Sequence, residues 1–253
     1  MKKVLAVFSL YIFSAINIFS QEVPELITDR PDQTESAAIV TKGWLQVETG
    51  VSFEQTKVKG LFGDININDY SIAGTLLRYG LNNSFELRFG GGYFITESDL
   101  FSNNNGFGEL FIGTKYLLPI KEINLAVLAH LGLPIGNDSY SPEKIEPEII
   151  LAAAQDLSEN VSLGINFGGR WESVAEETSF FYATALGISL TDKLAAFVEL
   201  YGNLTDELHK FDAGFTYLSS DHLQIDTSAG VNLNGENTNW FLSFGASFRI
   251  PKE

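Results

Sequence analysis

The sequence predicts an all-β fold: an antiparallel transmembrane β-barrel of the bacterial outer membrane with twelve strands. From Trp44 onward the chain consists of segments about ten residues long that are apolar at alternate positions and separated by turn residues. We count twelve such segments, and bacterial single-chain membrane barrels have an even number of strands. The polar faces carry Gly, Ser, Ala and Asn with few charges. This composition suits a confined lumen better than the charged outer face of a soluble β-sandwich.

Each segment is identified by its alternation, because successive side chains of a strand point to opposite faces. In SFELRFGG, Phe85 and Leu87 lie on one face and Glu86 on the other. The second segment, where Leu76 and Leu77 are adjacent, alternates less well, and we expect a β-bulge there. The sixth segment also shows only weak alternation. The predicted strands begin near residues 44, 69, 84, 107, 122, 147, 160, 178, 193, 208, 222 and 238.

The connections alternate between tight and long. Those after the even-numbered segments are short, such as TDK and LSSD, whereas residues 56–68, 96–106 and 134–146 form long connections after the first, third and fifth segments. Outer-membrane barrels have short periplasmic turns and longer extracellular loops. The pattern therefore places both chain ends of the barrel on the periplasmic side.

The first 43 residues differ from the rest. Residues 1–20 contain two lysines followed by an apolar run, which predicts a secretory signal peptide cleaved after Ser20, with an uncleaved anchor helix as the alternative. No Cys follows the run, which excludes a lipoprotein. Residues 21–43 lack a strand period and form a periplasmic N-terminal segment or a short plug. Residues 44–253 form the transmembrane β-barrel.

Composition narrows the possible functions. The chain of 253 residues suits one domain, and its lack of Cys excludes disulfides, thiolate metal sites and a Cys nucleophile. Its formal net charge is −16. Nucleic acid is excluded as a partner, because no basic face can displace counterions from phosphates.

The ionisable side chains of the strands fall on the polar faces. An Arg or Lys on the lipid face at mid-bilayer would cost about 2–4 kcal/mol, so we assign these residues to the lumen. Both signs of charge occur, and we expect pairing across neighbouring strands. The candidate lumen-lining residues are Glu48, Glu86, Arg88, Glu109, Lys115, His130, Glu148, Arg170, Glu199, Lys210, Asp212, Asp226 and Arg249.

Three charged residues before the first strand are candidates for a plug: Asp29, Arg30 and Asp32. One interpretation is a solvated periplasmic leader. The other is a plug in which Arg30 pairs with a lumen carboxylate such as Glu48 or Glu86, and the stiffness of Pro31 favours such ordered docking.

The stretch TDRPDQTESAAIVTKGWLQVETGVSF resembles the outer-membrane transporter family of the phenol-degradation meta-pathway type, in its Bacteroidetes-like form. Members commonly open with a TDRPDxT-like segment and a Gly-aromatic-x-Gln-x-Glu strand. The resemblance implies uptake of small aromatic compounds, but the family offers no catalytic or binding residues to carry over. The matching positions are Thr28, Asp29, Arg30, Pro31, Asp32, Thr34, Gly43, Trp44, Gln46 and Glu48.

No catalytic, metal or cofactor site is predicted. Asp64, Asn66 and Asn68 have the spacing of the first ligands in a calcium loop, but Asp69 stands where that loop needs Gly, so we expect a polar extracellular loop. The three histidines are His130, His209 and His222. They lie far apart in sequence, and no nearby Ser or acid has the spacing of a catalytic set.

The sequence therefore predicts a non-enzymatic barrel in the outer membrane of a Gram-negative bacterium. Its function would be passive passage of small solutes, some of them aromatic or hydrophobic. The alternatives are a structural or interaction barrel with a closed lumen and a membrane-embedded hydrolase. The expected partners are outer-membrane lipid, a small-molecule solute and, during biogenesis, the barrel-assembly machinery.

Overall fold

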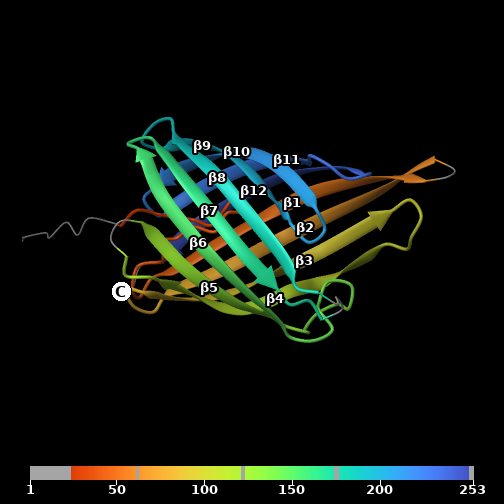
Figure 1. Cartoon of the computed structure of the whole chain (residues 1–253), viewed down its shortest axis with the longest axis horizontal. Coiled ribbons are helices and arrows are strands. Elements are labelled where there is room, and N and C mark those ends of the chain that lie inside the picture. Colours follow the sequence, from red (N-terminus) through yellow and green to blue (C-terminus); the bar gives the residue numbers. More distant parts are fainter. Residues whose placement is uncertain (1–23, 61–62, 121–122, 174–176, 251–253) are drawn as a thin grey trace, which may run out of the picture.

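The computed structural model describes residues 24–60, 63–120, 123–173 and 177–250, which form a closed antiparallel barrel of twelve strands (Figure 1). Strands that follow each other in sequence are neighbours, and β1 pairs with β12 to close the sheet. The predicted fold class is confirmed. The strands are β1 (Leu45–Gly60), β2 (Gly63–Gly80), β3 (Phe85–Ser98), β4 (Asn104–Leu117), β5 (Asn124–Gly132), β6 (Glu146–Ser158), β7 (Val161–Arg170), β8 (Ser179–Ser189), β9 (Leu194–Asn203), β10 (Leu208–Ser220), β11 (Leu223–Asn232) and β12 (Thr238–Ile250).

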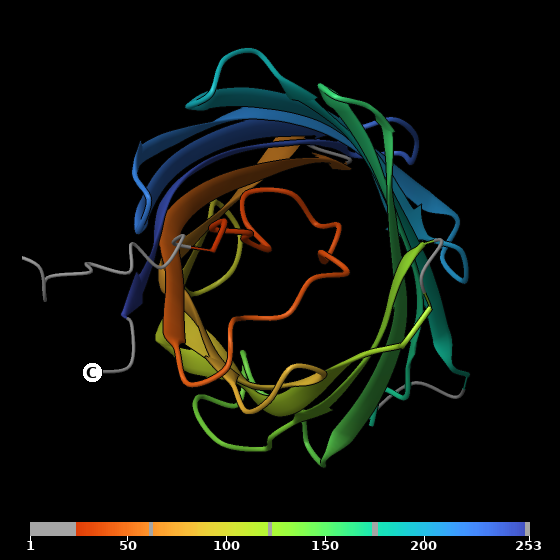
Figure 2. The same cartoon turned by 90° about the vertical axis from the view of Figure 1, so that its left-hand side faces the viewer.

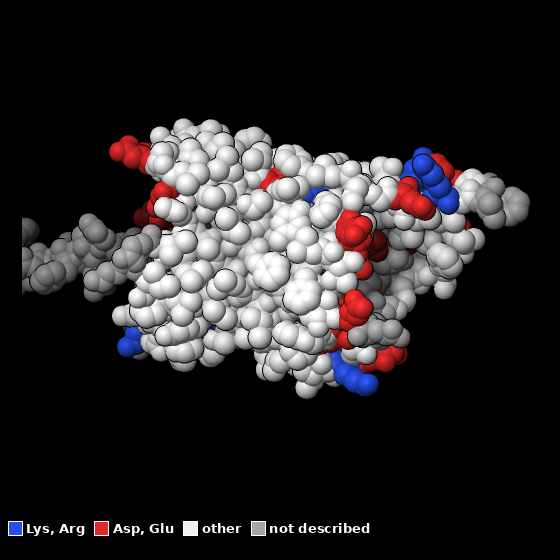
Figure 3. Space-filling view, in the orientation of Figure 1, with Lys and Arg blue, Asp and Glu red and all other residues white. Residues whose placement is uncertain are grey.

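The barrel is apolar outside and polar inside. In β3 the Leu87 and Phe89 side chains are exposed, whereas Glu86 and Arg88, which alternate with them, are buried. Figure 3 shows the same division on one face of the molecule, where a broad uncharged band covers the strands and charged side chains gather toward the ends. No helix in the described ranges is long and apolar enough to cross a membrane. The fully buried large side chains are mostly ionisable: Arg78, Lys115, Leu128, Glu48, Glu86, Glu199, Asp212 and Ser247.

Most strands begin within a few residues of the predicted positions, but two predicted loops were wrong. Residues 56–68 continue the β1–β2 hairpin, which pairs up to Gly60 and Gly63. Much of residues 96–106 likewise extends β3 and β4. These extensions are rich in polar residues and glycine, which is typical of loops, although Val58, Ile65 and Ile67 in the first of them keep the apolar alternation. Residues Asp64 to Asn68, predicted as a polar extracellular loop, therefore lie in β2.

The predicted bulge in the second strand is confirmed. The register of β2 shifts against both neighbours, and Ala73 adopts a left-handed φ of 53° at the shift. Upstream of it Ile72 faces outward, and downstream Leu77 and Tyr79 take the outward positions, so the parity of the strand reverses. This reversal directs Arg78 into the barrel, where it is fully buried.

The two ends of the barrel differ. The turns after β2, β4, β6, β8 and β10 form one end, which we call the short-turn end, and the connections after the odd-numbered strands form the long-loop end. Residues 24–43, which we call the inner segment, run inside the barrel rather than below it (Figure 2). The inner segment leads into β1 at the short-turn end, where Lys42 bridges to Gly80. The predicted signal peptide, residues 1–20, lies outside the described residues.

The outward apolar face predicts a depth-dependent cost for charge. Replacing Ile165 in the middle of β7, Ile165→Arg, should destabilise the barrel in lipid by about 2–4 kcal/mol, because the guanidinium would lie at mid-bilayer. Val161→Arg, at the end of the same strand, is the matched control and should cost about 0–1 kcal/mol. Equilibrium refolding into lipid vesicles measures both values, and equal costs at the two positions would contradict a lipid-facing surface.

Candidate functional site

The inner segment is held in the lumen by its own backbone. Four of its backbone amides donate hydrogen bonds to side chains of the barrel wall and not to the backbone of a strand. These amides belong to Asp29, Gln33, Glu35 and Val40. Their acceptors are Glu48, Glu199, Asn166 and Glu86, which come from β1, β9, β7 and β3. Within the described residues 24–41 the segment has no strand partner, so polar side chains of the barrel satisfy its buried backbone groups.

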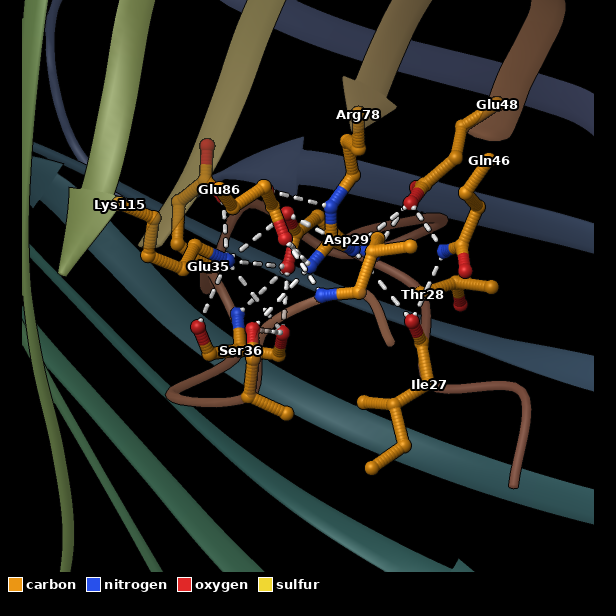
Figure 4. Close-up of polar contacts among 12 residues, drawn as sticks. Ile27, Thr28, Asp29, Glu35, Ser36, Gln46, Glu48, Arg78, Glu86 and Lys115 are labelled. Atoms are coloured by element: carbon orange, nitrogen blue, oxygen red, sulfur yellow. Dashed lines mark hydrogen bonds and ion pairs between the residues drawn. The ribbon is translucent and has the colours of Figure 1, made fainter. Parts of the chain in front are cut away.

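The Asp29 carboxylate is the centre of the densest cluster (Figure 4). Its Oδ2 lies 2.7 Å from Arg88 Nη1, 3.1 Å from Arg78 Nη1 and 3.0 Å from Lys115 Nζ. Its Oδ1 accepts hydrogen bonds from the backbone amide and the hydroxyl of Ser36. Three cations from three successive strands therefore converge on one carboxylate contributed by the inner segment.

Carboxylates of the wall complete this cluster. Arg78 Nε lies 2.8 Å from Glu86 Oε1, and Arg78 Nη1 lies 2.8 Å from Glu48 Oε1. The strand register brings these groups together, because Gln46 lies opposite Arg78 and Arg78 lies opposite Arg88. Every charged group in the cluster has a partner of opposite sign, as burial of charge requires. We call Asp29, Glu35, Glu48, Arg78, Glu86, Arg88 and Lys115 the charge cluster.

The acids of the inner segment have different electrostatic environments. Burial by itself would raise the pKa of Asp29, but Arg78, Lys115 and Arg88 together hold it well below its ordinary value. Burial raises the pKa of Glu35 to about 7, although Arg88 Nη2 lies 2.8 Å away. Asp29 is thus the charged anchor, and Glu35 is the group that titrates near neutrality.

Arg30 holds the other side of the segment. Its Nη2 lies 2.9 Å from Asp226 in β11 and 3.1 Å from the Ser243 hydroxyl in β12. Arg30 thus pairs with a lumen carboxylate, as the plug interpretation expected, but the partner is Asp226 instead of Glu48 or Glu86, because Arg78 already pairs with both of those carboxylates. The guanidinium lies against Gly50 of the wall, where a Cβ would come 2.6 Å from Nη2.

A second group of acids lies beside residues 32–34. Glu199 accepts hydrogen bonds from the Gln33 amide and the Thr34 hydroxyl, and it lies directly opposite Asp212 in the register. Neither carboxylate oxygen of the buried Asp212 has a partner in the described part of the chain. Burial, together with the nearby Glu199, raises the pKa of Asp32 well above its ordinary value.

Three cavities occupy the lumen beside the inner segment. The first is about 710 Å³ and is lined by Arg30, Glu35, Phe94, Glu109, His130, Tyr140 and Arg170, among others. The second is about 280 Å³ and includes Arg30, Asp32, Glu54 and Lys210. The third is about 440 Å³ and includes Gln33, Arg170, Phe181, Tyr201 and Lys210. All three therefore reach residues 30–35, which form a floor beneath them.

The predicted lumen residues occupy distinct places. Glu48, Glu86, Arg88 and Lys115 join the charge cluster, and Glu199, Asp212 and Asp226 lie beside the inner segment. His130, Glu148 and Arg170 form a chain on β5–β7, with His130 Nδ1 and Arg170 Nη2 at 2.9 and 2.6 Å from Glu148. Glu109 and Lys210 line cavities. Arg249 lies apart at the short-turn end, where it donates to the Glu25 carbonyl and stacks on Trp44.

Arg78 and Glu35 are the important residues that the sequence did not indicate. Arg78 follows the β2 bulge, so simple alternation from the upstream half of the strand places it on the lipid face. The cost of a charge there was the signal that could have identified the reversal. Glu35 lies in a segment without period, where no pattern shows which side chains are buried.

The residues considered for metal binding and for catalysis lie in separate places. Asp64 pairs with exposed Lys57 on the β1–β2 hairpin, and the described residues contain no group of three or more His, Cys, Asp or Glu that could hold a metal. His209 lies 3.1 Å from the Tyr182 hydroxyl, and His222 packs on Trp44. The three histidines therefore occupy three separate places.

The fold and the polar lumen define a twelve-stranded outer-membrane barrel with an internal N-terminal segment. The chain belongs to the family described as "Putative MetA-pathway of phenol degradation", which its residues 28–250 match. Among curated proteins, no sequence matches.

Solved structures show the same fold. An outer membrane channel from Pseudomonas putida F1 is 13% identical with a TM-score of 0.68, covering 88% of this chain and 100% of its own. The Ralstonia pickettii toluene transporter TbuX is 7% identical with a TM-score of 0.50, covering 87% and 92%. The transport unit of the Escherichia coli autotransporter AIDA-I is 10% identical with a TM-score of 0.51, covering 95% and 97%.

The charge cluster makes docking of the inner segment depend on Asp29. Asp29→Ala removes the carboxylate that Arg78, Arg88 and Lys115 share, and we expect docking to weaken by about 3–5 kcal/mol, the usual cost of breaking a buried ion pair. Hydrogen exchange at the Gln33, Glu35 and Val40 amides should accelerate while strand amides stay protected. Asp192→Ala, an exposed acid in the β8–β9 turn, is the control. Unchanged exchange in Asp29→Ala would contradict the role of the anchor.

The raised pKa of Glu35 predicts that docking of the inner segment depends on pH. Its docked pKa of about 7 lies above the ordinary value, so the docked state binds a proton more tightly, and docking weakens as pH rises from about 4.5 to 7. Asp29 acts in the opposite sense, but only below its ordinary pKa near 4. Proteolytic cleavage of the inner segment should therefore increase between about pH 5 and pH 8. Glu35→Gln should reduce the slope of this profile, and the raised pKa of Asp32 accounts for the slope that remains. A parent profile without slope would exclude the effect.

Proposed function

We propose that the protein is a channel of the outer membrane of a Gram-negative bacterium, with its N- and C-termini on the periplasmic side, and that it lets small solutes pass passively. Its lipid-facing surface would contact outer-membrane lipid, and its short turns would face the periplasm. The single observation that carries the proposal is the wide polar lumen, with cavities of about 710, 440 and 280 Å³ between the inner segment and the long-loop end.

The size and lining of these cavities support passage of small solutes. Ligand pockets commonly have volumes of about 300–1,000 Å³ and combine aromatic walls with a few polar groups. The first cavity fits this description, with Phe94, Phe111 and Tyr140 beside charged groups. We propose that its solutes include small aromatic compounds, as the family description and the toluene transporter of the same fold suggest.

We propose that the inner segment is the gate of the channel. It forms the floor of all three cavities and is tied to the wall on several sides, by Asp29 to β2–β4 and by Arg30 to β11 and β12. A solute that crosses must therefore displace part of the segment or pass beside it. Polar contacts, more than a packed apolar core, hold the segment, and water can replace such contacts when the segment is displaced.

Transport is favoured over catalysis by the placement of the reactive groups. His130 is held by Glu148, His209 contacts Tyr182, and His222 lies at the short-turn end. Among the described residues, none of these rings makes a hydrogen bond to a Ser or Thr hydroxyl that could serve as a nucleophile.

Conductance in a planar lipid bilayer tests the proposal. The parent should give rare or small current steps, and a form lacking residues 21–43 should give larger and steadier ones, because the floor of the cavities is gone. Asp29→Ala should lie between them, and Asp192→Ala should match the parent. Silence from every form would sink the channel function and leave a structural barrel. Equal, full conductance in parent and deletion would retain the channel but remove the gate.

A further inference from the structure

The basic side chains that line the three cavities are all already paired. Arg170 Nη2 lies 2.6 Å from Glu148, Lys210 Nζ lies 3.0 Å from Glu54, and Arg30 pairs with Asp226. Several acids of the same cavities have no basic group within 4.0 Å in the described part of the chain. These acids are Glu109, Glu146, Glu172 and Asp206. The charge left over for a solute is therefore negative.

Glu109 projects into the first cavity from an unusual backbone. Its φ of 52° lies in the left-handed region, which costs a residue with a Cβ, and the β3–β4 register shifts beside it. The exposed carboxylate thus stands in the cavity on a bulge. Strained positions of this kind are retained where surrounding structure or function requires them.

His130 supplies an independent polar group in the same cavity wall. Its Nδ1 lies 2.9 Å from Glu148, a carboxylate that can only accept, so Nδ1 carries the hydrogen and Nε2 of the neutral ring is an acceptor. Nε2 is buried and has no donor among the described residues, although His130 lines the cavity and is only 7% exposed. A ligand with an N–H donor would satisfy it.

The aromatic lining favours the same sign of charge. Phe94 and Tyr140 stack at 5.4 Å, and the Phe111 ring lies 4.7 Å from the His130 ring. All of these residues line the first cavity. Aromatic faces attract cations through the ring quadrupole, so they complement the unpaired acids rather than oppose them.

We propose that the first cavity binds an organic cation, a small primary ammonium group on an aromatic or apolar body, between Glu109, His130 and the Phe94–Tyr140 pair. The role of this site in solute passage rests on the proposed channel function. Binding of the cation can be measured even if the barrel is closed. A carboxylate of the same size is disfavoured, because it would face unpaired acids and an acceptor nitrogen. The lumen is accordingly selective for cations.

Binding to the full-length mature protein in detergent at about pH 7 tests the site. The probes are 2-phenylethylamine, an ammonium ion at this pH, and phenylacetate, an anion of the same size, compared by isothermal titration calorimetry. The amine should bind at least about tenfold more tightly, since a like-charge contact costs more than the 1.4 kcal/mol that tenfold represents. Equal binding, tighter binding of phenylacetate, or no binding of either would overturn the proposal.

A variant pair tests the location. Glu109→Gln should weaken amine binding about tenfold and leave the fold intact, because Glu109 makes no ion pair in the described structure. Glu159→Gln, in the β6–β7 turn at the opposite end, is the matched control and should bind as the parent does. Unchanged affinity in Glu109→Gln would overturn the assignment of this cavity.

The reversal potential of the current through the parent protein, in a potassium chloride gradient, separates the two proposals. Current that favours cations supports the inference, and current that favours anions overturns it while the channel function stands. Absence of current would contradict the channel function alone, because amine binding to the cavity is decided by calorimetry.

Discussion

The structure depends on the neutralisation of three buried cations by a residue that belongs to no strand. Arg78, Arg88 and Lys115 project from neighbouring strands into the lumen, and Asp29 of the inner segment lies against all three. Without it, the cations would rely on Glu48, Glu86 and Glu35 alone. Because unpaired charge in a confined space is costly, the barrel wall and the inner segment are electrostatically one unit.

This constraint explains the arrangement of the lumen. The side of the barrel that holds the charge cluster is filled by paired groups and by the backbone of the inner segment. The opposite side, beside Asp32, Glu199 and Asp212, is rich in acids that lack basic partners. The three cavities lie between the inner segment and the barrel wall. The proposed gate and the proposed preference for cations would both follow from this distribution of charge.

The fold was predictable because alternation is a local signal. A strand that faces lipid on one side and a lumen on the other must alternate, and this property identified twelve segments and most of their starting points. The prediction failed where polar residues and glycine outnumber the apolar ones. Residues 56–68 have the composition of a loop, although Val58, Ile65 and Ile67 alternate, and their strand character is evident from their pairing within the hairpin and with β3 and β12. The inward position of Arg78 depends on a bulge whose exact place alternation does not give.

The sequence by itself determined the barrel, its strand number, the inward direction of most charges and the separate nature of residues 21–43, because each is encoded in period or composition. Only the tertiary structure decided where the inner segment lies and which charges pair. Asp29 meets Lys115 across 86 positions of sequence, and Arg30 meets Asp226 across 196. Closing a barrel sets these distances through strand register and tilt, and no local pattern in a chain carries that information.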